Sequence, residues 1–203
     1  MRVHRTVGLL VMTGFIAACT DSLTEPASPD TDVMFAVAGA NPVVGSARGS
    51  GHAPCGEDTP MTCSEGGELR TFSFNAQAYA DGTASGRAQT NNRQNGNRIK
   101  ADIDVCVRFF GPANRAWMIG TVTDSNVESG FAVGDKIGFA VSDNGEGSGE
   151  ETDQIMGIGH AAPGDIAYIC GGGPEGFLNF LFDNFFAFDI AGGNVQVQAP
   201  EAG

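Results

Sequence analysis

Five carboxylates within eleven residues are the strongest candidate for site chemistry in this sequence. They surround glycines 145, 147 and 149, and they are Asp143, Glu146, Glu150, Glu151 and Asp153. Calcium takes six to eight oxygen ligands, and glycines allow carbonyls and carboxylates to converge on one ion. The order of these residues does not follow an EF-hand loop. The segment predicts either a calcium site or the solvated end of a hairpin, with Asp143 and Asn144 capping the turn.

Histidine chemistry is the second candidate. Beyond the first 20 residues the chain has two histidines, His52 and His160, and both lie among Gly and Pro residues. Neither belongs to a nucleophile elbow or an H-E-x-x-H helix, which would supply a base beside a nucleophile or metal. We therefore expect no enzyme and assign no catalytic residue. A hydrolase of envelope polymers is the remaining enzymatic alternative, because glycoside hydrolysis needs only two carboxylates at a set separation.

Five cysteines define the third group. One of them, Cys19, lies near the N-terminus, and the other four are Cys55, Cys63, Cys106 and Cys170. An even number of cysteines indicates disulfides where a chain is exported to an oxidising compartment. Three pairings are open, and we favour Cys55 with Cys63 and Cys106 with Cys170, the latter joining two distant strands. Zinc is not expected, because the spacing and the histidines do not supply its usual ligand pairs.

The N-terminus has the three parts of an export signal. Arg2, His4 and Arg5 precede an apolar run from Val7 to Ile16, and small residues lead to Cys19. The ending Ile-Ala-Ala-Cys resembles the lipobox of bacterial lipoproteins. This resemblance implies cleavage after residue 18, acylation of Cys19, palmitate included, and attachment to a membrane through the lipid. Thr20 resembles the second residue of cargo sent to the outer membrane, where a cell has two.

The charge is strongly acidic. The chain has 11 Lys and Arg against 24 Asp and Glu, a formal charge of −13, and loss of the signal with Arg2 and Arg5 would make it −15. Nucleic acid is therefore not an expected partner, because its binding requires clustered cations.

Residues 19–42 are rich in Ser, Thr, Pro, Asp and Ala, which predicts a flexible tether.

A period of two dominates the chain from residue 43 onward, and this period is typical of half-buried strands. The clearest example is the segment 99–109, in which six apolar side chains share one face of the expected strand and Cys106 points to the other face. The six are Ile99, Ala101, Ile103, Val105, Val107 and Phe109. Turn dipeptides such as Asp81-Gly82 separate the segments. We predict an all-β domain over 43–198, an antiparallel β-sandwich or jelly-roll-like barrel of about 8–10 strands braced by disulfides, followed by a tail at 199–203.

Six phenylalanines lie in the 14 residues from Phe177 to Ile190. They are Phe177, Phe180, Phe182, Phe185, Phe186 and Phe188. We predict a hairpin that turns at Asp183-Asn184, with many rings in the core. An exposed contact patch and a short helix are the alternatives, since large apolar patches usually mark contacts.

Several short motifs recur in one order over roughly residues 43–198. They are Phe72-Ser73-Phe74-Asn75, Asp81-Gly82 with Gly86, Ala116-Trp117, residues 141–147, Asp153-Gln154-Ile155 and residues 192–197. Together they resemble a group of small, mostly uncharacterised exported bacterial β modules. The resemblance implies the fold and the exported location. It implies no activity.

These observations predict a non-catalytic lipoprotein of the cell envelope, an interaction or structural module whose partner is an envelope protein or a glycan. A calcium-assisted glycan-binding domain is the alternative; no cofactor is expected for the module itself, and calcium belongs to this alternative.

Overall fold

The computed structural model describes residues 41–54, 69–112, 114–127, 131–145 and 151–200, all within one compact unit. Ten strands, two α-helices and a π-helical turn make up this part of the chain. In order, they are β1 (Val43–Pro54), β2 (Leu69–Tyr79), β3 (Ala84–Asn92), β4 (Arg98–Phe110), β5 (Arg115–Ser125), β6 (Lys136–Ser142), β7 (Gln154–Met156), β8 (Gly159–His160), α1 (Pro163–Cys170), α2 (Glu175–Leu181), the π-helical turn (Phe182–Phe186), β9 (Ala187–Asp189) and β10 (Gly192–Gln198).

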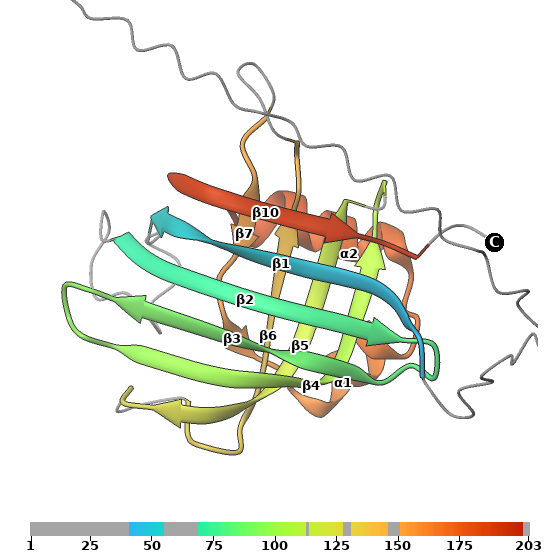
Figure 1. The fold of residues 1–203 in the computed structure, drawn as a ribbon, viewed down its shortest axis with the longest axis horizontal. Helices are drawn as coiled ribbons and strands as arrows, with labels where there is room; N and C mark the ends of the chain where they lie inside the picture. The colour runs from blue at the N-terminus through green and yellow to red at the C-terminus, as the bar shows by residue number, and fades with distance from the viewer. Residues whose placement is uncertain (1–40, 55–68, 113, 128–130, 146–150, 201–203) are drawn as a thin grey trace, which may run out of the picture. The chain divides into compact units, whose positions relative to one another are not determined.

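The strands form a single sheet (Figure 1). Its order is β10-β1-β2-β3-β4-β5-β6-β7-β9, and β8 pairs separately with β6. Every pairing between the described strands is antiparallel. The prediction of an antiparallel all-β fold is therefore confirmed, and the sheet curls into a half-barrel of nine strands.

The curl packs the two halves of the sheet face to face. Phe74 on β2 and Phe139 on β6 meet edge to face across the interior, with 5.5 Å between ring centroids. Around them lies the main core, which includes Ala47, Phe72, Ala76, Ile103, Ala116, Met118, Val141, Ile155, Ile190 and Val195. The period of two on β2 is confirmed: Phe72, Phe74, Ala76 and Ala78 are all buried.

The apolar alternation predicted for β4 holds only in its first half. Ile99, Ala101 and Ile103 are buried, but the pairing with β5 becomes irregular between Asp102 and Cys106. Beyond this point Cys106 and Phe110 are buried, whereas Val107 and Phe109 are partly buried. The reason is that this half of β4 is covered on both faces, so burial no longer separates odd from even positions.

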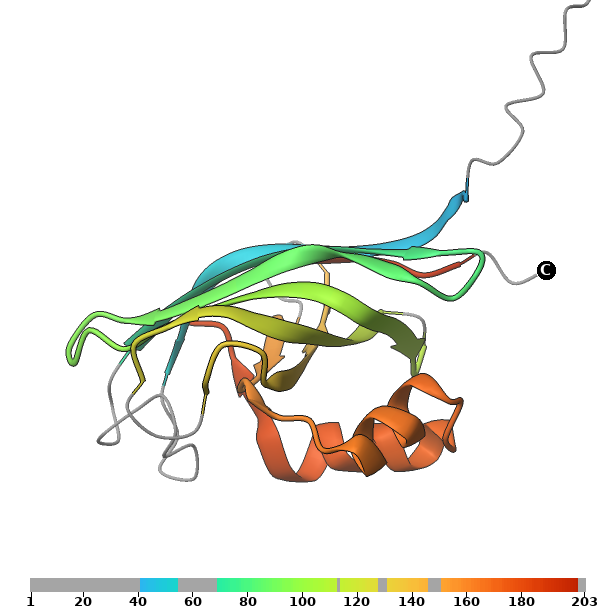
Figure 2. The same ribbon diagram turned by 90° about the horizontal axis from the view of Figure 1, so that it is seen from below.

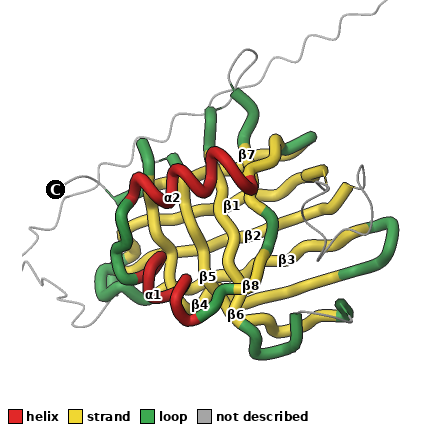
Figure 3. The backbone as a smooth tube through the Cα atoms, turned by 180° about the vertical axis from the view of Figure 1, so that it is seen from behind, coloured by secondary structure: helices red, strands yellow, loops and turns green. Residues whose placement is uncertain are grey.

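Helices cover the outer face of β4, β5 and β6 (Figures 2 and 3). A second apolar cluster lies between these layers and includes Cys106, Phe110, Trp117, Ile119, Ala140, Ile169, Leu178 and Phe182. Cys106 bonds to Cys170, which confirms this predicted pairing. Cys170 is the last residue of helix α1, however, so the bridge joins a strand to a helix. The prediction that it joins two strands was wrong.

The predicted phenylalanine hairpin is also wrong, because residues 175–186 are helical. Leu178 and Phe182 are four residues apart and fully buried, which is the spacing that places two side chains on one face of a helix. Phe177 and Phe180 are about half exposed. The segment is therefore helical because this spacing lets Leu178 and Phe182 pack together against the sheet. Phe182 belongs to the core and not to an exposed patch.

Candidate functional site

The outward faces of β1 to β4 carry polar side chains in rows that cross the strands. In one row Arg48, Asn75, Arg87 and Asp102 are register partners from β1 to β4. In the next row the partners are Ser50, Ser73, Gln89 and Lys100. Register partners on one face lie roughly 5 Å apart, so each row is a continuous line of polar groups.

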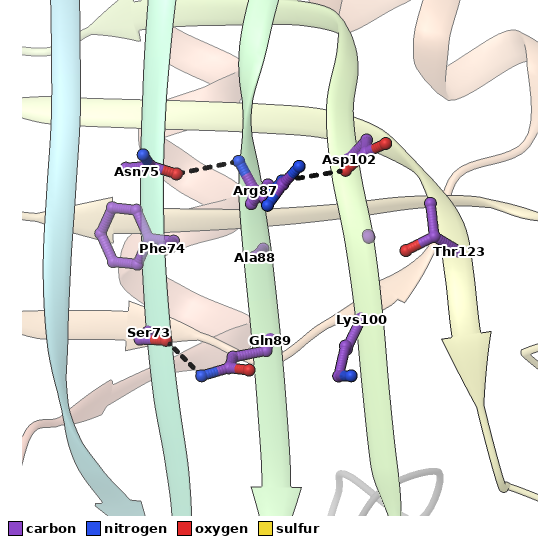
Figure 4. A pocket seen from close by; sticks show the side chains of 10 residues that line it. Ser73, Phe74, Asn75, Arg87, Ala88, Gln89, Lys100, Asp102 and Thr123 are labelled. Atoms are coloured by element: carbon purple, nitrogen blue, oxygen red, sulfur yellow. Dashed lines mark hydrogen bonds and ion pairs between the residues drawn. The ribbon is translucent and has the colours of Figure 1, made fainter.

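An open groove of about 680 Å³ lies along these rows (Figure 4). It is lined by Ser73, Phe74, Asn75, Arg87, Ala88, Gln89, Lys100, Ala101, Asp102 and Thr123. Ala88 and Ala101 occupy the positions between the two polar rows, and both are buried because their side chains point to the interior. The side chains that project outward along the groove are polar, in contrast to the apolar interior behind them.

Hydrogen bonds between neighbouring strands fix the groove side chains. Asn75 Oδ1 accepts the backbone N–H of Arg87 over 3.0 Å. Ser73 Oγ accepts a bond from Gln89 Nε2 over 2.9 Å, as the dashed lines of Figure 4 show. These contacts hold the amide and hydroxyl groups in place before any ligand binds, which lowers the entropy lost on binding.

The charged groups of the groove face water. The side chain of Arg87 is 87% exposed, and its Nε lies 3.7 Å from Asp102 Oδ1. Lys100 Nζ lies 3.2 Å from Asp124 Oδ2 at the groove's edge. The hydrogen bond from Lys100 and the charges of Arg98 and Lys100 lower the pKa of Asp124. Exposed ion pairs contribute little to stability, so Arg87 and Lys100 can exchange these partners for a ligand.

The groove offers amides, hydroxyls, two cations and one carboxylate, Asp102, among its described lining residues. Such groups bind a polar chain through many hydrogen bonds. Hydrolysis of a glycoside requires a second carboxylate at a set distance, and the described lining of the groove supplies only Asp102.

The predicted calcium residues lie partly outside the described chain, since Glu146 and Glu150 fall in 146–150. Asp153 Oδ1 accepts the N–H of Asn144 and its Oδ2 accepts that of Val195, while Glu151 is exposed. Asp143 accepts the N–H of Gly145, the turn-capping bond of the alternative interpretation. Among the described residues no three His, Cys, Asp or Glu side chains are grouped to hold a metal. Calcium binding stays a prediction.

The remaining predicted residues are dispersed. Cys19, Cys55 and Cys63 lie outside the described residues, as do the predicted signal and nearly all of the tether. The phenylalanines of the predicted contact patch do not all share one environment. Phe188 is partly buried on β9, and the side chains of Phe185 and Phe186 lie outside the described part of the structure.

The two histidines lie on different strands. His52 is exposed on β1, and His160 on β8 stacks on Phe131 with 4.6 Å between centroids. The structure places neither histidine among the groove residues.

Sequence reasoning missed the groove. The period of two that places Phe72 and Phe74 inside also places Ser73 and Asn75 outside. That signal identifies a polar face on each strand, but it does not tell which strands are neighbours.

Among the described residues, no helix has the length and apolar character needed to cross a membrane. Comparisons with protein-family models, with curated proteins and with solved structures found no match for this chain.

Proposed function

We propose that this protein is a non-catalytic module of the cell envelope that binds a polar glycan in the groove over β2, β3 and β4. One observation carries the proposal. The polar side chains of the groove come from outward positions on β2, β3 and β4, with Thr123 of β5 beside them, and together they line one open groove on a rigid sheet. Binding sites on rigid elements hold their groups in place better than loops do.

The charge of the groove selects the ligand. Arg87 and Lys100 lie on adjacent strands in a chain whose formal charge is −13. Guanidinium and ammonium groups bind carboxylates and phosphates through charge-assisted hydrogen bonds. An acidic glycan, one with carboxylate or phosphate groups along a hydroxyl-rich chain, therefore matches the groove better than a neutral glycan.

Calorimetric titration of the full chain with polygalacturonate tests the proposal, with dextran as the neutral comparison. We expect saturable binding of polygalacturonate that weakens as salt rises, since salt screens exposed charges. Arg87→Gln and Lys100→Gln should each weaken binding about tenfold, equivalent to about 1.4 kcal/mol.

Arg93→Gln is the matched control, because Arg93 is exposed in the turn between β3 and β4 and does not line the groove. An equal loss in all three variants would mean that only net charge matters. Binding of dextran with the same affinity, or no heat with either polymer, would overturn the proposed ligand.

Attachment of the module to a membrane is the second part of the proposal. The lipobox-like residues before Cys19 support acylation of its thiol. Expression in a bacterial host should yield membrane-bound protein whose mass includes the lipid. Cys19→Ser should release the protein, and an unmodified mass for the natural chain would contradict acylation.

A further inference from the structure

A second cavity, distinct from the polar groove, lies between the helices and the outer face of the sheet. Its volume is about 390 Å³. It is lined by Trp117, Ile119, Gly138, Met156, Gly159, His160, Ala161, Gly164, Asp165, Tyr168, Ile169, Phe177 and Leu181. Ligand pockets of proteins have volumes of about 300–1,000 Å³ and mostly apolar walls, and this cavity has both properties.

Glycines create the space. Gly138 on β6 and Gly159 on β8 are register partners, so two neighbouring strands present no side chain here. A Cβ on Gly159 would meet nothing within 4 Å, and the same holds for Gly164 on helix α1 above it. The bare backbone at Gly159 and Gly164 therefore leaves a gap between the two layers, whereas the Ile119 side chain covers Gly138.

Aromatic rings form the walls. Tyr168 on α1 and Phe177 on α2 meet edge to face, with 5.4 Å between their centroids. Phe177 is 47% exposed although it lines the cavity, so part of this ring faces water. Trp117 projects from β5 between the layers and is almost completely buried. Flat rings and bare glycine backbone favour a flat ligand, because stacked and edge-to-face contacts then cover both of its sides.

The polar groups in the cavity limit the ligand further. No Lys or Arg occurs among the described lining residues, and the Asp165 carboxylate accepts the N–H of Ala162. An anionic head group would therefore meet the Asp165 carboxylate and no Lys or Arg, since the His160 imidazole is the one basic group among the described lining residues. Trp117 Nε1 is buried and has no hydrogen-bond partner. A Cβ on Gly138 would lie 2.8 Å from Ile119 Cδ1 and 3.3 Å from Nε1, so the Ile119 side chain fills the space beside this donor, and an acceptor of a ligand reaches Nε1 only when that side chain rotates away.

Three attachments hold the helices over the cavity. The Cys106–Cys170 disulfide ties the end of α1 to β4. Arg108 donates to the carbonyls of Ile169 and Gly173, which caps the C-terminal end of α1. Arg115 on β5 pairs with Asp183 over 2.8 Å. The cavity is thus preformed, and the helices do not have to assemble around a ligand.

We propose that this cavity binds an uncharged, flat, ring-containing molecule with one hydrogen-bond acceptor, independently of the glycan groove. Trp117 is the single tryptophan of the chain, so its fluorescence reports on this site alone. Coumarin is a suitable probe, since it is flat and uncharged and carries a carbonyl. Titration of the full chain should quench Trp117 fluorescence with saturation, and laurate, an anionic acyl chain, should not displace coumarin.

Two glycines give a matched pair of variants. Gly164 and Gly176 are the second residues of α1 and α2, and a Cβ on either meets nothing within 4 Å, but only Gly164 lines the cavity. Gly164→Leu should weaken coumarin binding at least tenfold, whereas Gly176→Leu should leave it unchanged. Gly159→Leu fills the cavity from the sheet side and should repeat the loss at an unaltered melting temperature. Equal quenching in all three variants, or displacement of coumarin by laurate, would overturn the proposal.

Discussion

The backbone N–H of Val195 donates to Asp153 Oδ2 over 2.8 Å, and this bond joins the free edge of β10 to the residue that precedes β7. Asp143 Oδ2 accepts the N–H of Val197 in the same way over 2.9 Å. An edge strand presents unpaired N–H groups that can recruit another chain. Here Asp153 and Asp143 accept the N–H groups of Val195 and Val197, and these two bonds link opposite ends of the curled sheet.

Replacement of Asp153 should therefore weaken the fold. Both carboxylate oxygens accept backbone N–H bonds in a buried setting, and hydrogen bonds to charged groups contribute about 1.5–3 kcal/mol each. Asp153→Ala should lower the free energy of unfolding by about 3 kcal/mol in urea denaturation. Asp153→Asn should also destabilise, because its amide NH₂ would face one of the two donors. Glu151→Ala, at an exposed position, is the control, and an equal effect there would contradict this role.

Removal of the Cys106–Cys170 disulfide should destabilise the domain through the unfolded state. The bridge closes a loop with a sequence separation of 64, for which the chain-entropy model gives about 4 kcal/mol. Cys106→Ala combined with Cys170→Ala should lower the urea midpoint by a corresponding amount. The same variant should weaken coumarin binding, because it frees the end of α1. A midpoint equal to that of the natural chain would contradict the contribution of the bridge.

Arg70 is a buried cation whose removal should stabilise the fold. It is 3% exposed, its Nη2 has no hydrogen-bond partner, and burial lowers its pKa to about 10. Because burial holds the pKa of Arg70 below its value in the unfolded chain, desolvation of the charge opposes folding at every pH below about 10. Arg70→Met should raise the free energy of unfolding at pH 7 by about 1–3 kcal/mol, because it removes the charge and keeps a long side chain.

Arg70→Ala is the comparison for this prediction. It removes the same charge but leaves a cavity, and it also loses the contact of the guanidinium with the Phe188 ring at 5.9 Å. We expect the Arg70→Ala variant to have a clearly lower free energy of unfolding than the Arg70→Met variant. Equal destabilisation by both variants would show that the charge itself stabilises the protein.

Asp81 should add an acid-sensitive contribution to stability. Hydrogen bonds from the side chain and backbone of Thr83, and from Asn41, lower its pKa below 3.8 in the turn after β2. Because the folded pKa is below the unfolded one, the contribution is present above pH 3.8 and is lost as pH falls through the folded value. The difference in melting temperature between the natural chain and Asp81→Asn should be constant at pH 5–7 and shrink below about pH 4. A difference independent of pH between 2 and 6 would contradict this account.

The sequence determined which way most side chains point. In a strand, neighbouring residues face opposite sides by geometry alone, so Phe74 inside, Ser73 outside and Cys106 opposite Ile103 follow from their positions. The antiparallel all-β class and the Cys106–Cys170 bridge could be predicted for the same reason, since each depends on local alternation or on residue type.

Only the tertiary structure decided which of these faces meet. The groove requires β2, β3 and β4 to be neighbours in one register, and the cavity requires Gly138 opposite Gly159 under α1. The sequence around Asp143 and Asp153 is equally suited to binding an ion or backbone N–H groups, and the return of β10 to this end of the sheet gave both carboxylates N–H partners. Contacts between residues far apart in the chain depend on how the whole sheet curls, and no local spacing encodes that curl.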